Sequence, residues 1–198
     1  MQTDMTVGKP MKMLLNFTIP VFLGNVFQQL YSMADAVIVG KFVGTKGLAA
    51  VGATGTITFL IIGFLMGITT GVTVLTSQKF GAGRMDEMRK TVGNAAILSA
   101  VIAVVMTAVS MLGMHRLLVF MHTPEDIFDG AYGYIMIICA GIFTQVLYNL
   151  VSSILRALGN SKTPLYFLIL AAGLNIVLDL VFIIFFHWGA PGAAWATV

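Results

Sequence analysis

The sequence predicts an all-α integral membrane protein, a polytopic helix bundle. Of its 198 residues 58% are hydrophobic and only 10% are charged, whereas a soluble domain is about one quarter charged. The mean hydropathy is +0.95. Successive apolar runs have about the 20 residues that a helix needs to cross a bilayer, and they are too long and too uniform for the strands of a membrane barrel. No basic run is long enough to suggest a nucleic acid partner.

The apolar runs predict five complete membrane-spanning helices and the start of a sixth. The complete helices are expected at residues 14–40, 52–78, 92–114, 131–155 and 165–186. The sixth begins near Gly192 and stops at Val198, which is too short to cross a bilayer. The sequence is therefore interpreted as a cytoplasmic N-terminal segment, residues 1–13, followed by a membrane bundle, residues 14–198, that is truncated within its sixth helix.

The first run ends in "YSMADAVIVG" and contains an acid, Asp35, with no Lys or Arg within five residues. Ala34-Asp35-Ala36 also matches the small-x-small cleavage site of a signal peptide. The run is long and carries several amide side chains, so we expect an uncleaved helix. Pro20 is expected to kink this helix, as a static bend or as a hinge.

Two features of the remaining runs concern packing. Gly63, Gly67 and Gly71 form a four-residue repeat that predicts close helix packing in the second run. The single cysteine, Cys139, excludes an internal disulfide and is expected to be a small core or lipid-facing residue.

Basic residues in the short connections predict the orientation, since they collect on the cytoplasmic side. With the N-terminus inside, eight of the eleven Lys and Arg residues lie inside, and three lie outside. The inner ones are Lys9, Lys12, Lys79, Arg84, Arg89, Lys90, Arg156 and Lys162; the outer ones are Lys41, Lys46 and Arg116.

Two acids, Asp35 and Asp179, lie inside apolar runs, whereas the other six lie in the tail and connections. A carboxylate within a bilayer costs about 2.5 kcal/mol or more, and no Lys or Arg lies in the interior of any run. Each acid must therefore be protonated, hold a metal cation, or open onto water. The two helices run in the same direction and both acids fall in the outer half, so contact between them is plausible.

Other polar side chains accompany these acids. In the first helix Asn25, Gln28 and Ser32 share a face with Asp35, and Asn175 lies one turn before Asp179. The fourth run carries a polar stripe formed by Gln145, Asn149, Ser152 and Arg156. These side chains suit either a substrate cavity or simple hydrogen bonding between helices.

No HExxH, GxSxG, P-loop or paired CxxC motif occurs. We therefore expect no enzyme activity, no ATP-driven pump and no cofactor.

The chain resembles the MATE (multidrug and toxic compound extrusion) transporters. The stretches that carry the resemblance are "IPVFLGNVFQQLYSMADAVIVGKFVGTKGLAAVGATG", "SQKFGAGRMDEMRK", "ILRALGNSKTPLYF" and "LNIVLDLVFI". The resemblance is closest to bacterial members, and it implies the N-terminal lobe of a twelve-helix antiporter in a bacterial inner membrane. Such a protein would let H⁺ or Na⁺ enter while organic, often cationic, drugs leave, and a C-terminal lobe would complete it.

The resemblance also implies site residues. Asp35, Asn175 and Asp179 match the family's N-lobe cation site, where a proton or Na⁺ would bind. Tyr134 and Thr197 are the matching candidates for a tyrosine and a threonine that join it. Many relatives have Pro after the second acid, whereas Leu180 follows it here, so the local bend is expected to differ.

Two alternatives remain open. One is a flippase for lipid-linked precursors, which should have a strongly basic cavity to hold pyrophosphate. The other is a membrane fragment without transport activity. The sequence does not distinguish H⁺ from Na⁺ and does not define the range of drugs.

Overall fold

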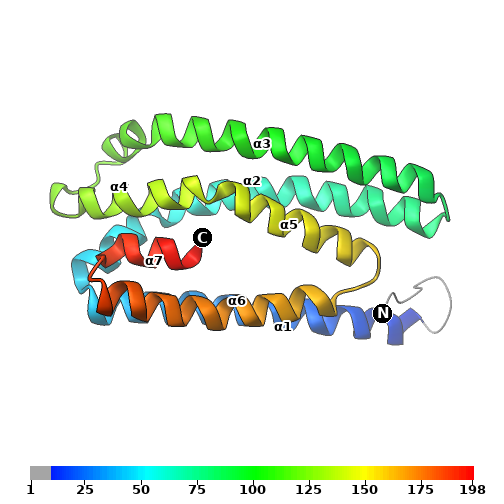
Figure 1. The fold of residues 1–198 in the computed structure, drawn as a ribbon, viewed down its shortest axis with the longest axis horizontal. Helices are drawn as coiled ribbons and strands as arrows, with labels where there is room; N and C mark the ends of the chain where they lie inside the picture. The colour runs from blue at the N-terminus through cyan, green and yellow to red at the C-terminus, as the bar shows by residue number, and fades with distance from the viewer. Residues whose placement is uncertain (1–9) are drawn as a thin grey trace.

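The computed structural model describes residues 10–198, and this part of the chain is almost entirely helical (Figure 1). The elements are α1 (Pro10–Phe42), α2 (Thr45–Gly81), α3 (Met85–Phe120), α4 (Glu125–Ala140), α5 (Ile142–Ala157), α6 (Lys162–Leu180), the π-helical turn η1 (Val181–Phe185) and α7 (Gly189–Thr197). The predicted helical membrane architecture is thereby confirmed. The expected segment 1–13 lies outside the described residues up to residue 9, and residues 10–13 already belong to α1.

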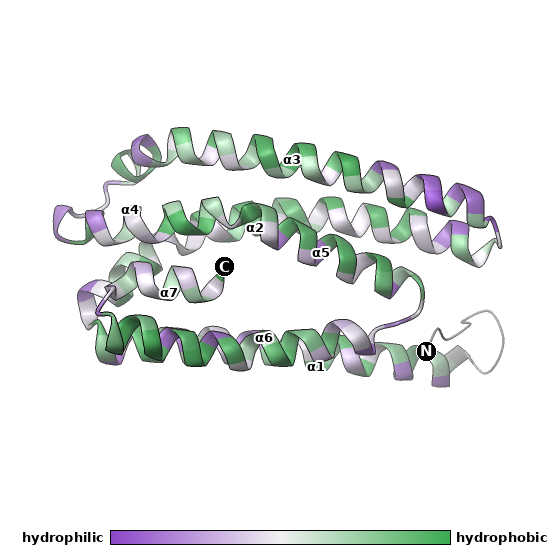
Figure 2. Cartoon of the chain, in the orientation of Figure 1, coloured by the Kyte–Doolittle hydropathy of each residue, from purple (hydrophilic) through white to green (hydrophobic). Residues whose placement is uncertain are grey.

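Among residues 10–198, four helices are long and apolar enough to cross a membrane: α1, α2, α3, and α6 together with η1. The span expected at 131–155 is present as a bent pair and not as one straight helix, because α4 and α5 meet at a bend of 46° around Gly141. Five spans result if this bent pair counts as one. Figure 2 shows apolar residues along every long helix, with polar residues gathered at the helix ends.

The helices form two groups, which lie at opposite edges of Figure 1. α1 packs along α6 in one group, and α2 packs against α3, α4 and α5 in the other. The short α7 lies against α4 and also contacts α6, so it joins the groups at one end of the bundle. Tight turns connect consecutive helices, and Gly44 (φ 92°) and Gly83 (φ 70°) adopt the left-handed backbone that these turns require.

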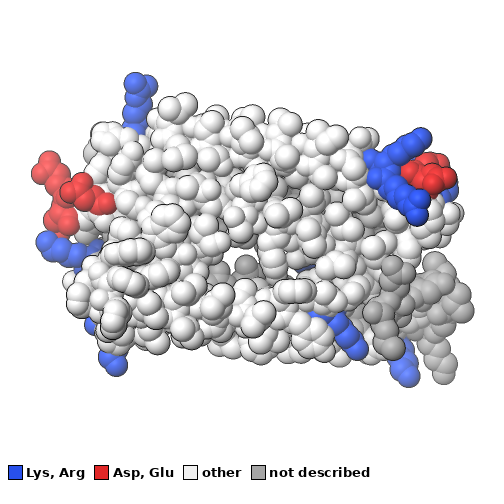
Figure 3. All heavy atoms as spheres, in the orientation of Figure 1, with Lys and Arg blue, Asp and Glu red and all other residues white. Residues whose placement is uncertain are grey.

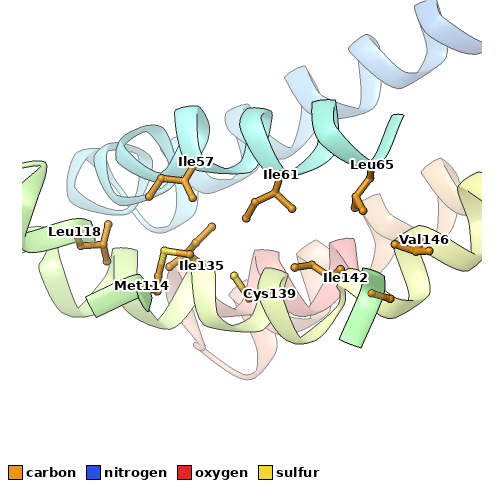
Figure 4. Close-up of a cluster of buried hydrophobic side chains, with 10 residues drawn as sticks. Ile57, Ile61, Leu65, Met114, Leu118, Ile135, Cys139, Ile142 and Val146 are labelled. Carbon is orange, nitrogen blue, oxygen red and sulfur yellow. The ribbon is translucent and has the colours of Figure 1, made fainter. Parts of the chain in front are cut away.

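The largest apolar cluster lies between α2 and the bent pair α4–α5 (Figure 4). Ile57, Ile61 and Leu65 follow one another along one face of α2, and Cys139 is fully buried among the residues that they face. This placement confirms Cys139 as a small core residue. Large apolar side chains outside the cavities remain exposed, for example Leu112 and Phe120, which suits contact with lipid.

The glycine repeat of α2 does not mediate close packing among the described helices. A Cβ atom added at Gly63, Gly67 or Gly71 would have open space around it, so this expectation is wrong. The close approach occurs instead at Gly141, where an added Cβ would lie 2.4 Å from the side chain of Val198.

The position after Asp179 shows how the chain behaves without a proline. α6 continues through Leu180 and then widens into the π-helical turn, in which the amide of Phe186 donates to the carbonyl of Val181 (3.1 Å). π-Helical turns inside helices often lie near functional sites, and this one begins two residues after the buried acid.

Candidate functional site

The packing of α1 against α6 brings the two membrane acids together. Asp35 is 9% exposed and Asp179 is completely buried, and their carboxyl groups lie close to each other. The sequence left this contact open, and the structure places the two side chains side by side. Asn175 is 6% exposed and lies one helical turn before Asp179, on the same face of α6.

The polar atoms of this cluster lack hydrogen-bond partners among the described residues. They are Asp35 Oδ1, both side-chain atoms Oδ1 and Nδ2 of Asn175, and both carboxyl oxygens of Asp179. Two carboxylates cannot donate a hydrogen bond to each other, so their proximity alone does not satisfy them. Buried polar groups are nearly always paired in proteins, and a group of unpaired oxygens indicates a place for a proton or a cation.

No basic side chain compensates the acids within the described part of the chain. The ion pairs found there lie at the ends of helices, between Lys46 and Asp126, and between Glu87 and both Lys79 and Arg84. When ionised, the two carboxyl groups would therefore have no positively charged side chain beside them to compensate their charge.

Asp35 lines a cavity of about 730 Å³ that is bounded by α1, α2, α4, α5 and α7. The cavity walls contain all three residues that the sequence assigned to a substrate cavity and the two that the resemblance added to the cation site. These are Asn25, Gln28, Ser32, Tyr134 and Thr197. Tyr134 is 7% exposed, and the hydroxyl of Thr197 donates to the carbonyl of Ala193 (3.0 Å).

Sequence reasoning missed part of this wall. Tyr31 and Thr58 also line the cavity, together with Gly141 and Ile142 at the bend between α4 and α5. Tyr31 lies one helical turn before Asp35, so its spacing from that acid could have identified it. No comparable sequence pattern indicates that Gly141 and Ile142 line the cavity.

Two smaller cavities adjoin the large one. One of about 310 Å³ is lined by Asn175, and one of about 80 Å³ is lined by Asn149, Ser152 and Arg156. Gln28 and Gln145 line all three cavities, so the polar stripe of α5 faces the polar face of α1. The 730 Å³ cavity thus combines the acid Asp35 with aromatic and amide walls. The adjoining 80 Å³ cavity contains one basic group, Arg156.

Known proteins resemble this chain closely. The family model described as MatE matches residues 20–181. The probable multidrug resistance protein YpnP of Bacillus subtilis (strain 168) is 33% identical over 195 residues, which cover 98% of this chain and 44% of the relative. A protein named FAD transporter from Shewanella oneidensis is 26% identical over 168 residues, 85% of this chain and 37% of the relative.

Solved structures agree with the sequence matches. A structure described as the outward-facing conformation of a multidrug resistance MATE family transporter of the MOP superfamily superimposes with a TM-score of 0.91 at 30% identity. It covers 96% of this chain, and this chain covers 42% of it. The chain thus spans less than half the length of the relatives that it matches.

Proposed function

This chain belongs to the MATE family of multidrug transporters, and we propose on that basis that it forms the N-terminal lobe of a cation-coupled secondary antiporter. The antiporter would export organic, often cationic, drugs while H⁺ or Na⁺ enters. The observation that carries this proposal is the buried pair of Asp35 and Asp179, which have unpaired oxygens and no basic neighbour among the described residues.

The coupling ion would bind at the acid pair. Carboxylate and amide oxygens are ligands for hard cations such as Na⁺, and a carboxyl pair can equally share a proton. Asp35, Asn175 and Asp179 would hold the ion, and the hydroxyls of Tyr134 and Thr197 would complete the site from the cavity side. Both ions fit this donor set, so the proposal extends to either.

The drug would occupy the large cavity beside the acids. Its walls combine the Asp35 carboxylate with the aromatic rings of Tyr31 and Tyr134 and with amide groups such as Gln28. Aromatic faces and a carboxylate attract organic cations, whereas the varied amides impose little shape selectivity. This combination suits a broad range of cationic drugs.

Transport would follow from competition between ion and drug for two conformations. Loading the acids with an ion lowers their charge and favours a conformation in which α1 is rearranged at Pro20. Emptying them favours the other conformation. A ligand shifts such an equilibrium only by its preference for one state, so drug and ion would drive each other across the membrane.

The cellular setting of the proposal is the inner membrane of a bacterium, with the N-terminus in the cytoplasm. The lobe would contact the bilayer on its outer faces and a C-terminal lobe across the drug path. The flippase alternative is disfavoured, because among the described residues that line the largest cavity there is an acid, Asp35, and no Lys or Arg.

The test replaces Asp35 and Asp179 separately with Asn in the protein that contains this chain. We expect each variant to lose pH-driven or Na⁺-driven drug efflux to the level of cells without the protein, since Asn cannot bind and release a proton. The matched control, Asp126→Asn, neutralises an exposed acid and should keep efflux. Unchanged efflux in both buried variants would eliminate the site, and loss in the control as well would show a general defect.

A further inference from the structure

The two ends of the bundle differ strongly in charge, as Figure 3 shows. One end contains the turn between α2 and α3, the turn between α5 and α6, and the start of α1; the other contains the remaining turns. Among residues 10–198, the first end has seven basic and two acidic side chains, and the second has three of each. The first set is Lys12, Lys79, Arg84, Arg89, Lys90, Arg156 and Lys162 with Asp86 and Glu87; the second is Lys41, Lys46 and Arg116 with Glu125, Asp126 and Asp129.

The turn between α2 and α3 holds most of this excess. Glu87 contacts both Lys79 and Arg84 and thereby fixes the two sides of the turn to each other. Arg89 and Lys90, in the first turns of α3, are exposed and have no ion-pair partner among the described residues. The turn is therefore an ordered structure that presents unpaired positive charge.

The helices next to this turn present apolar side chains. Val74 and Leu75 on α2 are exposed, and so are Ile97 and Leu98 on α3, and the two helices pack against each other. A cluster of positive charge thus lies directly beyond an exposed apolar surface that a bilayer would cover. Basic groups next to a membrane span attract anionic lipid headgroups, and the helices below can contact acyl chains.

We propose that the turn between α2 and α3 binds the headgroup of an anionic phospholipid, with Arg84, Arg89 and Lys90 around its phosphate. Arg84 also contacts Glu87, at 3.4 Å, but its side chain is 56% exposed and remains accessible to a headgroup. Lys79 takes part less, because Glu87 engages it and its side chain is only 27% exposed. The acyl chains would lie along the exposed faces of α2 and α3. The interaction is independent of the acid pair, so it would persist in a variant that does not transport.

The test compares lipids near the two ends of the bundle. A fluorophore is attached at Ala82→Cys in the turn, or at Met121→Cys at the opposite end, both in a Cys139→Ser background. The labelled protein is reconstituted in phosphatidylcholine vesicles with a minor fraction of spin-labelled phosphatidylglycerol or spin-labelled phosphatidylcholine. The ratio of quenching by the two lipids reports the local enrichment of the anionic headgroup.

We expect phosphatidylglycerol to quench at least about twofold more than phosphatidylcholine at position 82, and equally at position 121. The triple variant R84Q/R89Q/K90Q should bring the ratio at position 82 to that at position 121. The control K41Q/K46Q/R116Q, which removes the same charge at the other end, should leave it unchanged. Equal ratios at both positions in the unaltered protein, or a triple variant that keeps the excess, would overturn the proposal.

Discussion

Asp179 is a residue whose burial is costly for folding, and the proposed ion site would explain why the cost is retained. Its side chain is completely buried, and neither carboxyl oxygen has a hydrogen-bond donor among the described residues. An unsatisfied buried polar group costs about 1–3 kcal/mol, and a charged group costs more. Such a cost is retained where an activity needs the group, which supports its role as an ion site.

Replacing Asp179 with Asn should therefore stabilise the protein while it abolishes transport. At neutral pH we expect the free energy of unfolding to rise by about 1–3 kcal/mol, because a charge that faces Asp35 is removed and an amide can donate to that carboxylate. Thermal unfolding in detergent measures the change. A lower Tm than that of the unaltered protein would show that Asp179 has a partner that stabilises its charged form.

The contacts of Glu87 predict that the stability of the turn between α2 and α3 depends on pH. The hydrogen bond from Lys79, with the nearby charge of Arg84, holds the pKa of Glu87 below its ordinary value. A depressed pKa in the folded state means that the stabilisation is complete above the ordinary value, about 4.3, and is lost as the pH falls through the lowered pKa. We expect the turn to loosen only in acid, which hydrogen exchange of residues 80–88 would detect.

The control for this prediction is Glu87→Gln, which cannot change its charge. Its turn should exchange faster than that of the unaltered protein at neutral pH and should show no further change across the acidic window. Identical exchange in the two proteins at neutral pH would mean that the contacts of Glu87 do not order the turn.

For single residues, the sequence identified the candidate acids but did not predict that they lie close together. Asp35 and Asp179 stand out because each is an acid within an apolar run. Their contact could not be derived, since their depths depend on helix ends that hydropathy locates only within several residues. The structure begins α6 at Lys162, three residues before the predicted start, and begins α1 at Pro10.

Among the helices, the bent pair α4–α5 departs most from expectation. Residues 131–155 are apolar and predict one helix, yet the chain bends at Gly141, beside Val198, the residue after α7. A lone glycine in an apolar run rarely marks a break, so tertiary packing determines the bend. By contrast, the existence and order of the long helices followed from the length of each apolar run.

Two glycine substitutions test this account of close packing. Gly141→Ala places a Cβ atom 2.4 Å from Val198, so α7 or the bend must shift, at a cost of about 1–3 kcal/mol. Gly63→Ala is the matched control in α2, where the space is open and a helix gains up to about 1 kcal/mol from alanine. Thermal unfolding should show a lower Tm for the first and an equal or higher Tm for the second. The reverse order would place the critical contact on α2.

For the molecule as a whole, the unequal charge of the two ends predicts orientation. Positively charged turns remain in the cytoplasm, so the turn between α2 and α3 should face inward. In a Cys139→Ser background, Ala82→Cys should react with a membrane-impermeant maleimide only after the membrane is opened, whereas Met121→Cys should react in intact spheroplasts. Labelling in the opposite pattern would invert the topology.

The helix bundle and its family could be predicted from the sequence, because hydropathy and the quoted motifs extend along most of the chain. The cavities could not, because their shape depends on how far α5 lies from α1 after the bend. Gln28 of α1 and Gln145 of α5 line the same cavities, and the sequence alone does not place these two helices relative to each other.

The bend at Gly141 would let the volume of the large cavity depend on the angle between α4 and α5. Gly141 and Ile142 form part of the wall of the 730 Å³ cavity, so straightening the 46° angle would move α5 and alter the room available to a guest. A molecule bound in this cavity would favour the 46° bend between α4 and α5. Substitutions that straighten the bend would then weaken the affinity for that molecule. The curvature of one helix pair would then set how large a compound this lobe accepts.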